Sequence, residues 1–208
     1  CKFCVVPATN MRKWRARNPA SVVSEMEFLS VVHNVNEFHL EDLNPTISNS
    51  RIVEICELIL EKDLKFQIKI VAGTKIEGIK SVETIKLMAK AGFQYISISP
   101  ESGSKKLLRK INKNFDFQHA HRMIRQAYRS GITTQACFII GFPGERLKDN
   151  LLTLMAIIRF TFFGLDEIAA FIVSPIPGSD IYASFEGQFS NFSQLNFSPR
   201  WRQRYKVF

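Results

Sequence analysis

The sequence has few cysteines and no long apolar run, and both shortages narrow the class of protein. Only four of its 208 residues are cysteines, without the regular spacing of the disulfide frameworks that small secreted domains use. The longest apolar stretch, "LLTLMAIIRFTFF", is interrupted by Arg159 and is too short to cross a bilayer. No signal peptide is visible. A cytoplasmic location is expected, with a peripheral position at a membrane as the alternative.

Acidic residues are outnumbered by basic ones, with 19 Asp and Glu against 28 Lys and Arg and a formal charge of +9. The densest basic stretch is "SPRWRQRYK", where the cations alternate with Trp201 and Tyr205. This stretch suits nucleic acid, a membrane surface or an anionic substrate, and a solvated tail is the plain alternative. We expect residues 1–185 to form one folded domain and residues 186–208 to be a basic, Phe-rich C-terminal extension.

Short β-type runs alternate with helical stretches along the whole chain. Strands are predicted at "EFHLE", "KFQIKIVA", "QYISIS", "TTQACFIIG" and "EIAAFIVS", with a helix in each gap. The first helix should begin at Asn18 and Pro19 with an apolar stripe of Val22, Val23, Met26, Leu29 and Val32. Ser48, Ser81 and Asp116 are predicted to cap later helices. This rhythm is typical of a parallel α/β sheet or barrel, whose chemistry gathers at the carboxyl ends of the strands.

The opening "CKFC" is the only closely spaced cysteine pair. A thiolate pair on a loop can hold part of a metal centre, but zinc needs two further ligands and the histidines show no spacing that completes such a site. From spacing alone, an iron–sulfur role, a zinc role and an incidental pair all remain open. Cys56 and Cys137 fall on a predicted helix and strand and are expected to be core residues.

Five further stretches follow "CKFC" in order: "RNPASVVSEMEFL", "FHLEDLNPT", "SISPESGSKKLLRKINK", "GITTQACFIIGFPGE" and "SPIPGSDIY". Together they resemble the radical S-adenosylmethionine (radical SAM) enzymes, and most of all the branch associated with cobalamin-binding domains. The signature of that family is CxxxCxΦC, with Φ aromatic, on the loop after the first barrel strand. "CKFC" looks like its second half, with Phe3 at Φ.

The resemblance implies a partial (β/α)6 TIM-like barrel of parallel strands, truncated in its first strand. Cys1 and Cys4 would be ligands of a [4Fe–4S] cluster, and the third cysteine would lie four residues before Cys1. By the same resemblance, the residues expected to contact S-adenosylmethionine are Phe3, Glu41, Asp42, Glu101, Ser102, Ile140 and Gly141.

The implied activity is reductive cleavage of S-adenosylmethionine to a 5′-deoxyadenosyl radical, for methylation or rearrangement of a small-molecule or lipid substrate. Implied partners are an electron donor such as flavodoxin or ferredoxin and an N-terminal cobalamin-binding domain, and residues 1–208 alone are expected to be inactive. An RNA-modifying, methylthiotransferase-like enzyme is the alternative within the family. Outside it, a zinc- or nucleic-acid-binding module is the alternative, and a metal-free lyase barrel is disfavoured because no strand-end lysine has an evident activating partner.

Overall fold

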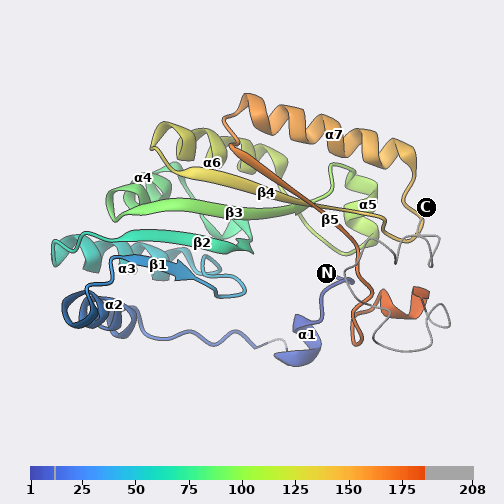
Figure 1. Ribbon diagram of the computed structural model, residues 1–208. Helices are drawn as coiled ribbons and strands as arrows, with labels where there is room; N and C mark the ends of the chain where they lie inside the picture. The colour runs from blue at the N-terminus through green and yellow to red at the C-terminus, as the bar shows by residue number, and fades with distance from the viewer. Residues whose placement is uncertain (12, 186–208) are drawn as a thin grey trace.

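A computed structural model describes residues 1–11 and 13–185 and shows one layer of strands with helices packed along it (Figure 1). The sheet has the order β1-β2-β3-β4-β5. Its strands are β1 (Glu37–Leu40), β2 (Gln67–Thr74), β3 (Phe93–Glu101), β4 (Thr133–Ile140) and β5 (Glu167–Ile172). The helices are α1 (Val6–Thr9), α2 (Pro19–His33), α3 (Asn49–Glu61), α4 (Val82–Lys90), α5 (Lys105–Lys110), α6 (Phe117–Arg129) and α7 (Leu147–Phe162), with 3-10 turns η1 (Ile76–Gly78) and η2 (Tyr182–Phe185).

All four strand pairings are parallel, as the alternation of strands and helices predicts. Within the described residues, β1 and β5 pair only with their inner neighbours, so the sheet is open rather than closed into a ring. This confirms the parallel, partial-barrel fold class. The predicted extension at 186–208, with its basic stretch, lies outside the described residues.

The helix starts follow the predicted caps. The side chain of Asn18 accepts hydrogen bonds from the first-turn amides of α2, and Ser48, Ser81 and Asp116 do the same for α3, α4 and α6. Each cap satisfies a backbone donor that has no partner inside the helix. Local chemistry therefore decides where four of the helices begin.

The main core lies between one face of the sheet and the helices. Alternate residues of β2 and β3 point into it and are fully buried, among them Ile68, Ile70, Ile96 and Ile98. The apolar face of α3 meets them, and its Cys56, predicted to be a core residue, has no exposed surface. No helix in the described part of the chain is long and apolar enough to span a membrane.

Two details of the predicted core are wrong. Val32, at the end of the expected α2 stripe, is 56% exposed, because α2 packs mainly on α3 and only Val23 and Met26 are buried. Cys137 is half-buried rather than core, since it alternates with the buried Ala136 and Phe138 and so points to the opposite face of the sheet.

Candidate functional site

The cysteine loop at residues 1–4 is tied to the carboxyl-terminal end of the sheet. The amide of Lys2 donates to the carbonyl of Ile111, just after α5, over 2.8 Å, and the carbonyl of Lys2 accepts from Ile181 at 3.0 Å. A hydrogen bond from the Cys4 amide to the Cys1 carbonyl closes the turn. Both thiols are free, with Cys1 exposed and Cys4 half-buried. The predicted ligand pair therefore lies beside the segments that follow β3 and β5.

Phe3 anchors this loop by packing. Its ring meets Phe142, in the loop after β4, edge to face with 5.5 Å between centroids. Phe3 is partly buried against a second apolar cluster of Leu107, Leu108, Ile111, Phe142, Val173, Ile181 and Phe185. Because that cluster joins α5 to the loops after β4 and β5, Phe3 holds the cysteine turn at the strand ends.

Glu101, the last residue of β3, is buried and ion-paired. It is 6% exposed, and its Oε1 lies 3.0 Å from Nζ of Lys113, whose side chain is also about nine-tenths buried. Burial raises the pKa of Glu101, and the Lys113 ammonium opposes that rise. The carboxylate predicted to contact S-adenosylmethionine therefore has a partner, Lys113, that the sequence did not indicate.

The backbone of Glu101 is unusual for a residue with a side chain. Its φ is 65°, in the left-handed region, which costs a non-glycine residue about 1 kcal/mol or more. The register of β3 against β4 also shifts between Ile98 and Glu101. Such irregularities cluster at functional sites, where they redirect a side chain.

Ser102 is fully buried and its hydroxyl is used inside the protein. It lies 3.1 Å from the hydroxyl of Thr153 on α7, and it accepts from the amide of Ser104 at 3.1 Å. Gly103 packs against α7 as well, because a Cβ there would be 2.2 Å from the carbonyl oxygen of Leu152. The "SGS" turn therefore docks α5 on α7 and supports Glu101, and a direct cofactor contact of Ser102 stays a prediction.

The "GFPGE" loop after β4 is held by its own last residue. One carboxylate oxygen of Glu145 accepts from the amides of Gly141 and Phe142. Its other oxygen, Oε1, is buried and has no hydrogen-bond partner within the described part of the chain. Burial is the main reason that the pKa of Glu145 is raised. Gly141 needs its φ of 88° to make this turn.

The predicted contacts on β4 are at the right end of the strand. Ile140 is its last residue and is half-buried, and its carbonyl accepts from the amide of Val173 after β5 at 2.9 Å. Gly141 follows directly and is buried. Glu145 is a second residue that the sequence reasoning passed over, although the final letter of "GFPGE" was a signal for it.

Glu41 and Asp42 follow β1 and are both exposed. Among the described contacts, neither side chain has a hydrogen bond or ion pair that links it to the cysteine loop or to Glu101. The loop is instead built on Asn44, whose side-chain oxygen accepts from the hydroxyl of Thr74 at 2.8 Å. The structure therefore brings Cys1, Cys4, Phe3 and the β4 loop together, and leaves the acidic pair at the same edge of the sheet without a shared contact.

The cysteine turn supplies two free thiols at this edge of the sheet. Within the described residues, no group of three or more His, Cys, Asp and Glu side chains is placed to hold a metal ion. Thiolates are the usual ligands of iron–sulfur clusters. The orphaned buried oxygen of Glu145 and the buried carboxylate of Glu101 add acceptors for a polar ligand beside them.

Comparison with known proteins agrees with this arrangement. A family profile described as "Radical SAM superfamily" matches residues 1–155, which include the cysteine turn, Glu101 and the "GFPGE" loop. The anaerobic magnesium-protoporphyrin IX monomethyl ester cyclase of Cereibacter sphaeroides is 28% identical over 201 residues, covering 95% of this chain and 32% of that protein. A tRNA-2-methylthio-N(6)-dimethylallyladenosine synthase from a Sulfurihydrogenibium species is 27% identical over 188 residues, covering 86% of this chain and 41% of that protein.

A solved structure shows the same fold. The radical S-adenosylmethionine methyltransferase TsrM from Kitasatospora setae, described with cobalamin and a [4Fe–4S] cluster bound, superposes with a TM-score of 0.68 at 19% identity, over 80% of this chain and 31% of that chain. The chain spans 26% to 33% of the length of the first relatives it matches. With the profile matching three quarters of its residues, the chain belongs to the radical SAM superfamily, whose members are enzymes.

Proposed function

We propose that this chain is the core of a radical SAM enzyme in which Cys1 and Cys4 ligate a [4Fe–4S] cluster and the strand ends bind S-adenosylmethionine. The observation that carries the proposal is the docking of the "CKFC" turn at the carboxyl-terminal edge of the sheet. Lys2 bonds to Ile111 there and Phe3 packs on Phe142. A thiolate pair fixed at the edge where α/β folds bind ligands suits a cofactor centre.

The residues divide this task. Cys1 and Cys4 hold the cluster, with a third thiolate that the family signature places four residues before Cys1. Glu101 accepts hydrogen bonds from the ribose hydroxyls, and Glu41 and Asp42 accept from the amine. Ile140 covers the adenine from the end of β4. Phe3 and Phe142 exclude water beside the iron–sulfur cluster, because their rings pack together with the buried apolar side chains next to the cysteine turn.

The bound cofactors would supply one-electron cleavage of the sulfonium to a 5′-deoxyadenosyl radical, which is chemistry that protein side chains lack. The protein's own contribution is to orient them and to keep water out. The Lys113 ammonium favours the charged form of Glu101 and holds its carboxylate in place, since Nζ and Oε1 lie 3.0 Å apart in a buried setting. We propose that the reaction is methylation or rearrangement of a small-molecule or lipid substrate.

Anaerobic reconstitution of a version of the chain extended upstream of Cys1 tests this function. We expect bound iron and sulfide and, after reduction, 5′-deoxyadenosine detected by liquid chromatography. The Glu101→Gln variant should bind the same iron but form the nucleoside more slowly, because one charged acceptor is lost. An extended protein that binds no iron would exclude the proposal, whereas residues 1–208 alone should hold little iron and be inactive.

Partner proteins follow from the same proposal. The cluster needs an electron donor, and an acidic carrier such as flavodoxin or ferredoxin suits the exposed cations of α5, next to the cysteine turn. TsrM is described with cobalamin bound, and this chain covers about a third of it, so we propose a cobalamin-binding domain as a further part of the enzyme. The free thiols of this chain suit a reducing, cytoplasmic setting.

A second candidate is modification of tRNA, favoured by the likeness to the methylthio-adenosine synthase over 86% of this chain. It predicts RNA binding that weakens steeply with salt, because each phosphate contact releases counterions. A titration of tRNA into the extended protein at several salt concentrations separates the two. A flat salt response would leave the small-molecule or lipid substrate as the better proposal. If the chain were instead a zinc-binding module, metal analysis of the extended protein would find stoichiometric zinc in place of iron.

A further inference from the structure

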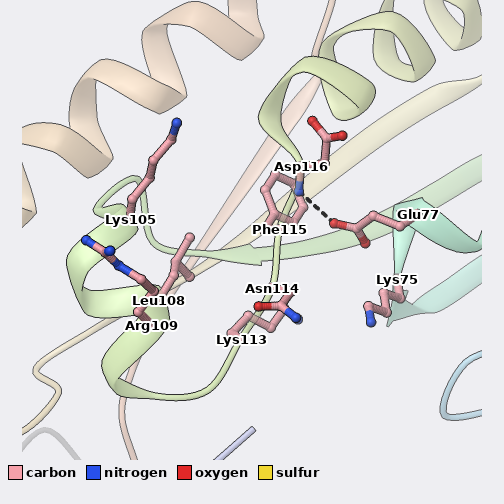
Figure 2. Close-up of a pocket in the computed structure, with 9 residues that line it drawn as sticks. All are labelled: Lys75, Glu77, Lys105, Leu108, Arg109, Lys113, Asn114, Phe115 and Asp116. Carbon is pink, nitrogen blue, oxygen red and sulfur yellow. Dashed lines mark hydrogen bonds between the residues drawn. The ribbon is translucent and has the colours of Figure 1, made fainter.

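A cavity of about 480 Å³ lies between the end of β2 and helix α5. Figure 2 shows Lys105 and Arg109 on α5 at one side of it and Lys75 and Glu77 at the other, with Phe115 between them. A space of this size holds a small organic molecule. Nothing in the family signature accounts for its lining.

The charges around the cavity are unbalanced. Lys75, Lys105, Arg109 and Lys113 line it against two carboxylates. Throughout residues 1–11 and 13–185, the side chains of Lys75, Lys105 and Arg109 have no ion-pair or hydrogen-bond partner. Three cations without internal partners around one cavity favour an anionic ligand.

Both carboxylates are turned toward the protein backbone instead. Oε1 of Glu77 accepts from the amide of Asp116 at 2.9 Å, which Figure 2 marks with a dashed line. Asp116 accepts from the amide of His119 at 3.0 Å as the cap of α6. The second oxygen of Glu77, Oε2, is buried and has no partner in the described part of the chain. An unsatisfied buried acceptor is costly, so a ligand that donates an N–H or O–H to this oxygen would gain binding free energy.

The cavity also has an apolar wall and a link to the proposed site. The ring of Phe115 lines it, held edge to face against Phe117 with 5.0 Å between centroids. Lys113 lines it as well and donates one of its N–H groups to Glu101. An ammonium has three donors, so an anion in the cavity would share Lys113 with Glu101.

We propose that this cavity binds an oxyanion, a phosphate or carboxylate group of a small molecule that also carries an N–H or O–H donor and an apolar part. Lys75, Lys105 and Arg109 bind the oxyanion, Glu77 accepts from the donor, and Phe115 covers the apolar part. Identifying this molecule with the enzyme's substrate rests on the function proposed above. The binding itself does not require the cluster.

Isothermal titration calorimetry of residues 1–208 at low ionic strength tests the site, with inorganic pyrophosphate as the phosphate probe and citrate as the carboxylate probe. The Lys105→Gln/Arg109→Gln variant should bind at least about tenfold more weakly, since each lost charge-assisted bond weakens affinity. The matched control is Lys86→Gln/Lys90→Gln, which removes two exposed cations at the same spacing on α4. Lys75→Gln, just after β2, repeats the test from the other side of the cavity, should the α5 variant fold poorly.

Saturable binding that only the cavity variants weaken supports the site, and the probe that binds identifies the oxyanion. Equal weakening by the α4 control would mean that net charge alone attracts the anion and would overturn the proposal. Absence of saturable binding of both probes at millimolar concentration would overturn it too. The Cys1→Ser/Cys4→Ser protein should bind as the unmodified chain does, so failure of the cluster proposal and failure of this site give different results.

Discussion

Glu101 combines burial, a left-handed backbone and a single cationic partner. At 6% exposed, its carboxylate loses most of its hydration, and the Lys113 ammonium at 3.0 Å is what replaces it. Breaking a buried ion pair from one side leaves an uncompensated charge, which is more costly than losing an exposed pair. Lys113 should therefore matter for stability before any cofactor binds.

The Lys113→Met variant should lower the free energy of unfolding at neutral pH by about 3 kcal/mol, since it strands the Glu101 charge. Urea denaturation measures this. Lys106→Met, at an exposed position of α5, should change it by less than about 0.5 kcal/mol. Adding Glu101→Gln to Lys113→Met should recover part of the loss, and a double variant worse than either single one would contradict the pairing.

The free energy of unfolding should depend on pH through the titration of Glu101. Burial raises the pKa of Glu101 in the folded chain above its ordinary value of 4.5. At a pH between the unfolded and the folded pKa, the folded chain therefore holds a proton that the unfolded chain has released. The contribution of Glu101 is therefore full below about pH 4.5 and is lost as the pH rises through the folded pKa. The free energy of unfolding of the unmodified chain, relative to Glu101→Gln, should fall over that interval. A relative free energy that rises with pH would refute the raised pKa.

The cysteines should divide by reactivity. Burial raises the pKa of Cys56 to about 12, and the residue has no exposed surface, whereas the thiols of Cys1 and Cys4 are accessible. Brief alkylation of the native chain near pH 8 should label Cys1 and Cys4 and spare Cys56, because the thiolate is the reactive form. Mass spectrometry of the digested protein reads the sites. Labelling of Cys56 as fast as Cys1, without denaturant, would contradict the packing of α3.

At the scale of elements, the contact between α7 and the turn that leads into α5 positions the end of β3. The hydroxyl of Ser104 donates to Asp149, and the amide of Gly103 donates to Thr153 at 3.0 Å. Gly103 allows the close approach, because a Cβ would meet backbone atoms of Leu152 at 2.2 and 2.6 Å. The two helices thus fix the turn that follows Glu101.

Gly103→Ala should lower the free energy of unfolding by about 2 kcal/mol or more, since neither backbone can give way easily. Gly131→Ala is the comparison. Its Cβ would meet nothing within 4 Å, although its φ of +73° disfavours a side chain, and its cost should be about 1 kcal/mol. Denaturation midpoints of the two variants test the order. A Gly103→Ala variant as stable as the unmodified chain would show that α5 and α7 can separate without loss.

At the scale of the whole molecule, the features that local sequence determines were predictable. The helix caps at Asn18, Ser48 and Asp116 could be predicted because each side chain accepts hydrogen bonds only from backbone amides two or three residues further along the chain. The parallel sheet followed from the alternation of strands and helices, and the position of the cysteine turn at its edge followed from the family resemblance.

The features that the sequence hid depend on contacts across the chain. Lys113 is 12 residues from Glu101, and no local pattern pairs them. The cavity cations come from the segment just after β2, from α5 and from the loop between α5 and α6, so only the fold brings Lys75 near Arg109. The exposure of Val32 depends on which elements cover α2, which its periodicity does not record.

The most direct test of the cluster proposal is Mössbauer spectroscopy of the upstream-extended protein, reconstituted anaerobically with ⁵⁷Fe and measured with and without S-adenosylmethionine. We predict a [4Fe–4S] spectrum in which one iron site changes when S-adenosylmethionine is added, because that iron has no thiolate ligand. Cys1→Ala and Cys4→Ala should each lose this spectrum. A full cluster in both cysteine variants, unchanged by S-adenosylmethionine, would contradict the account.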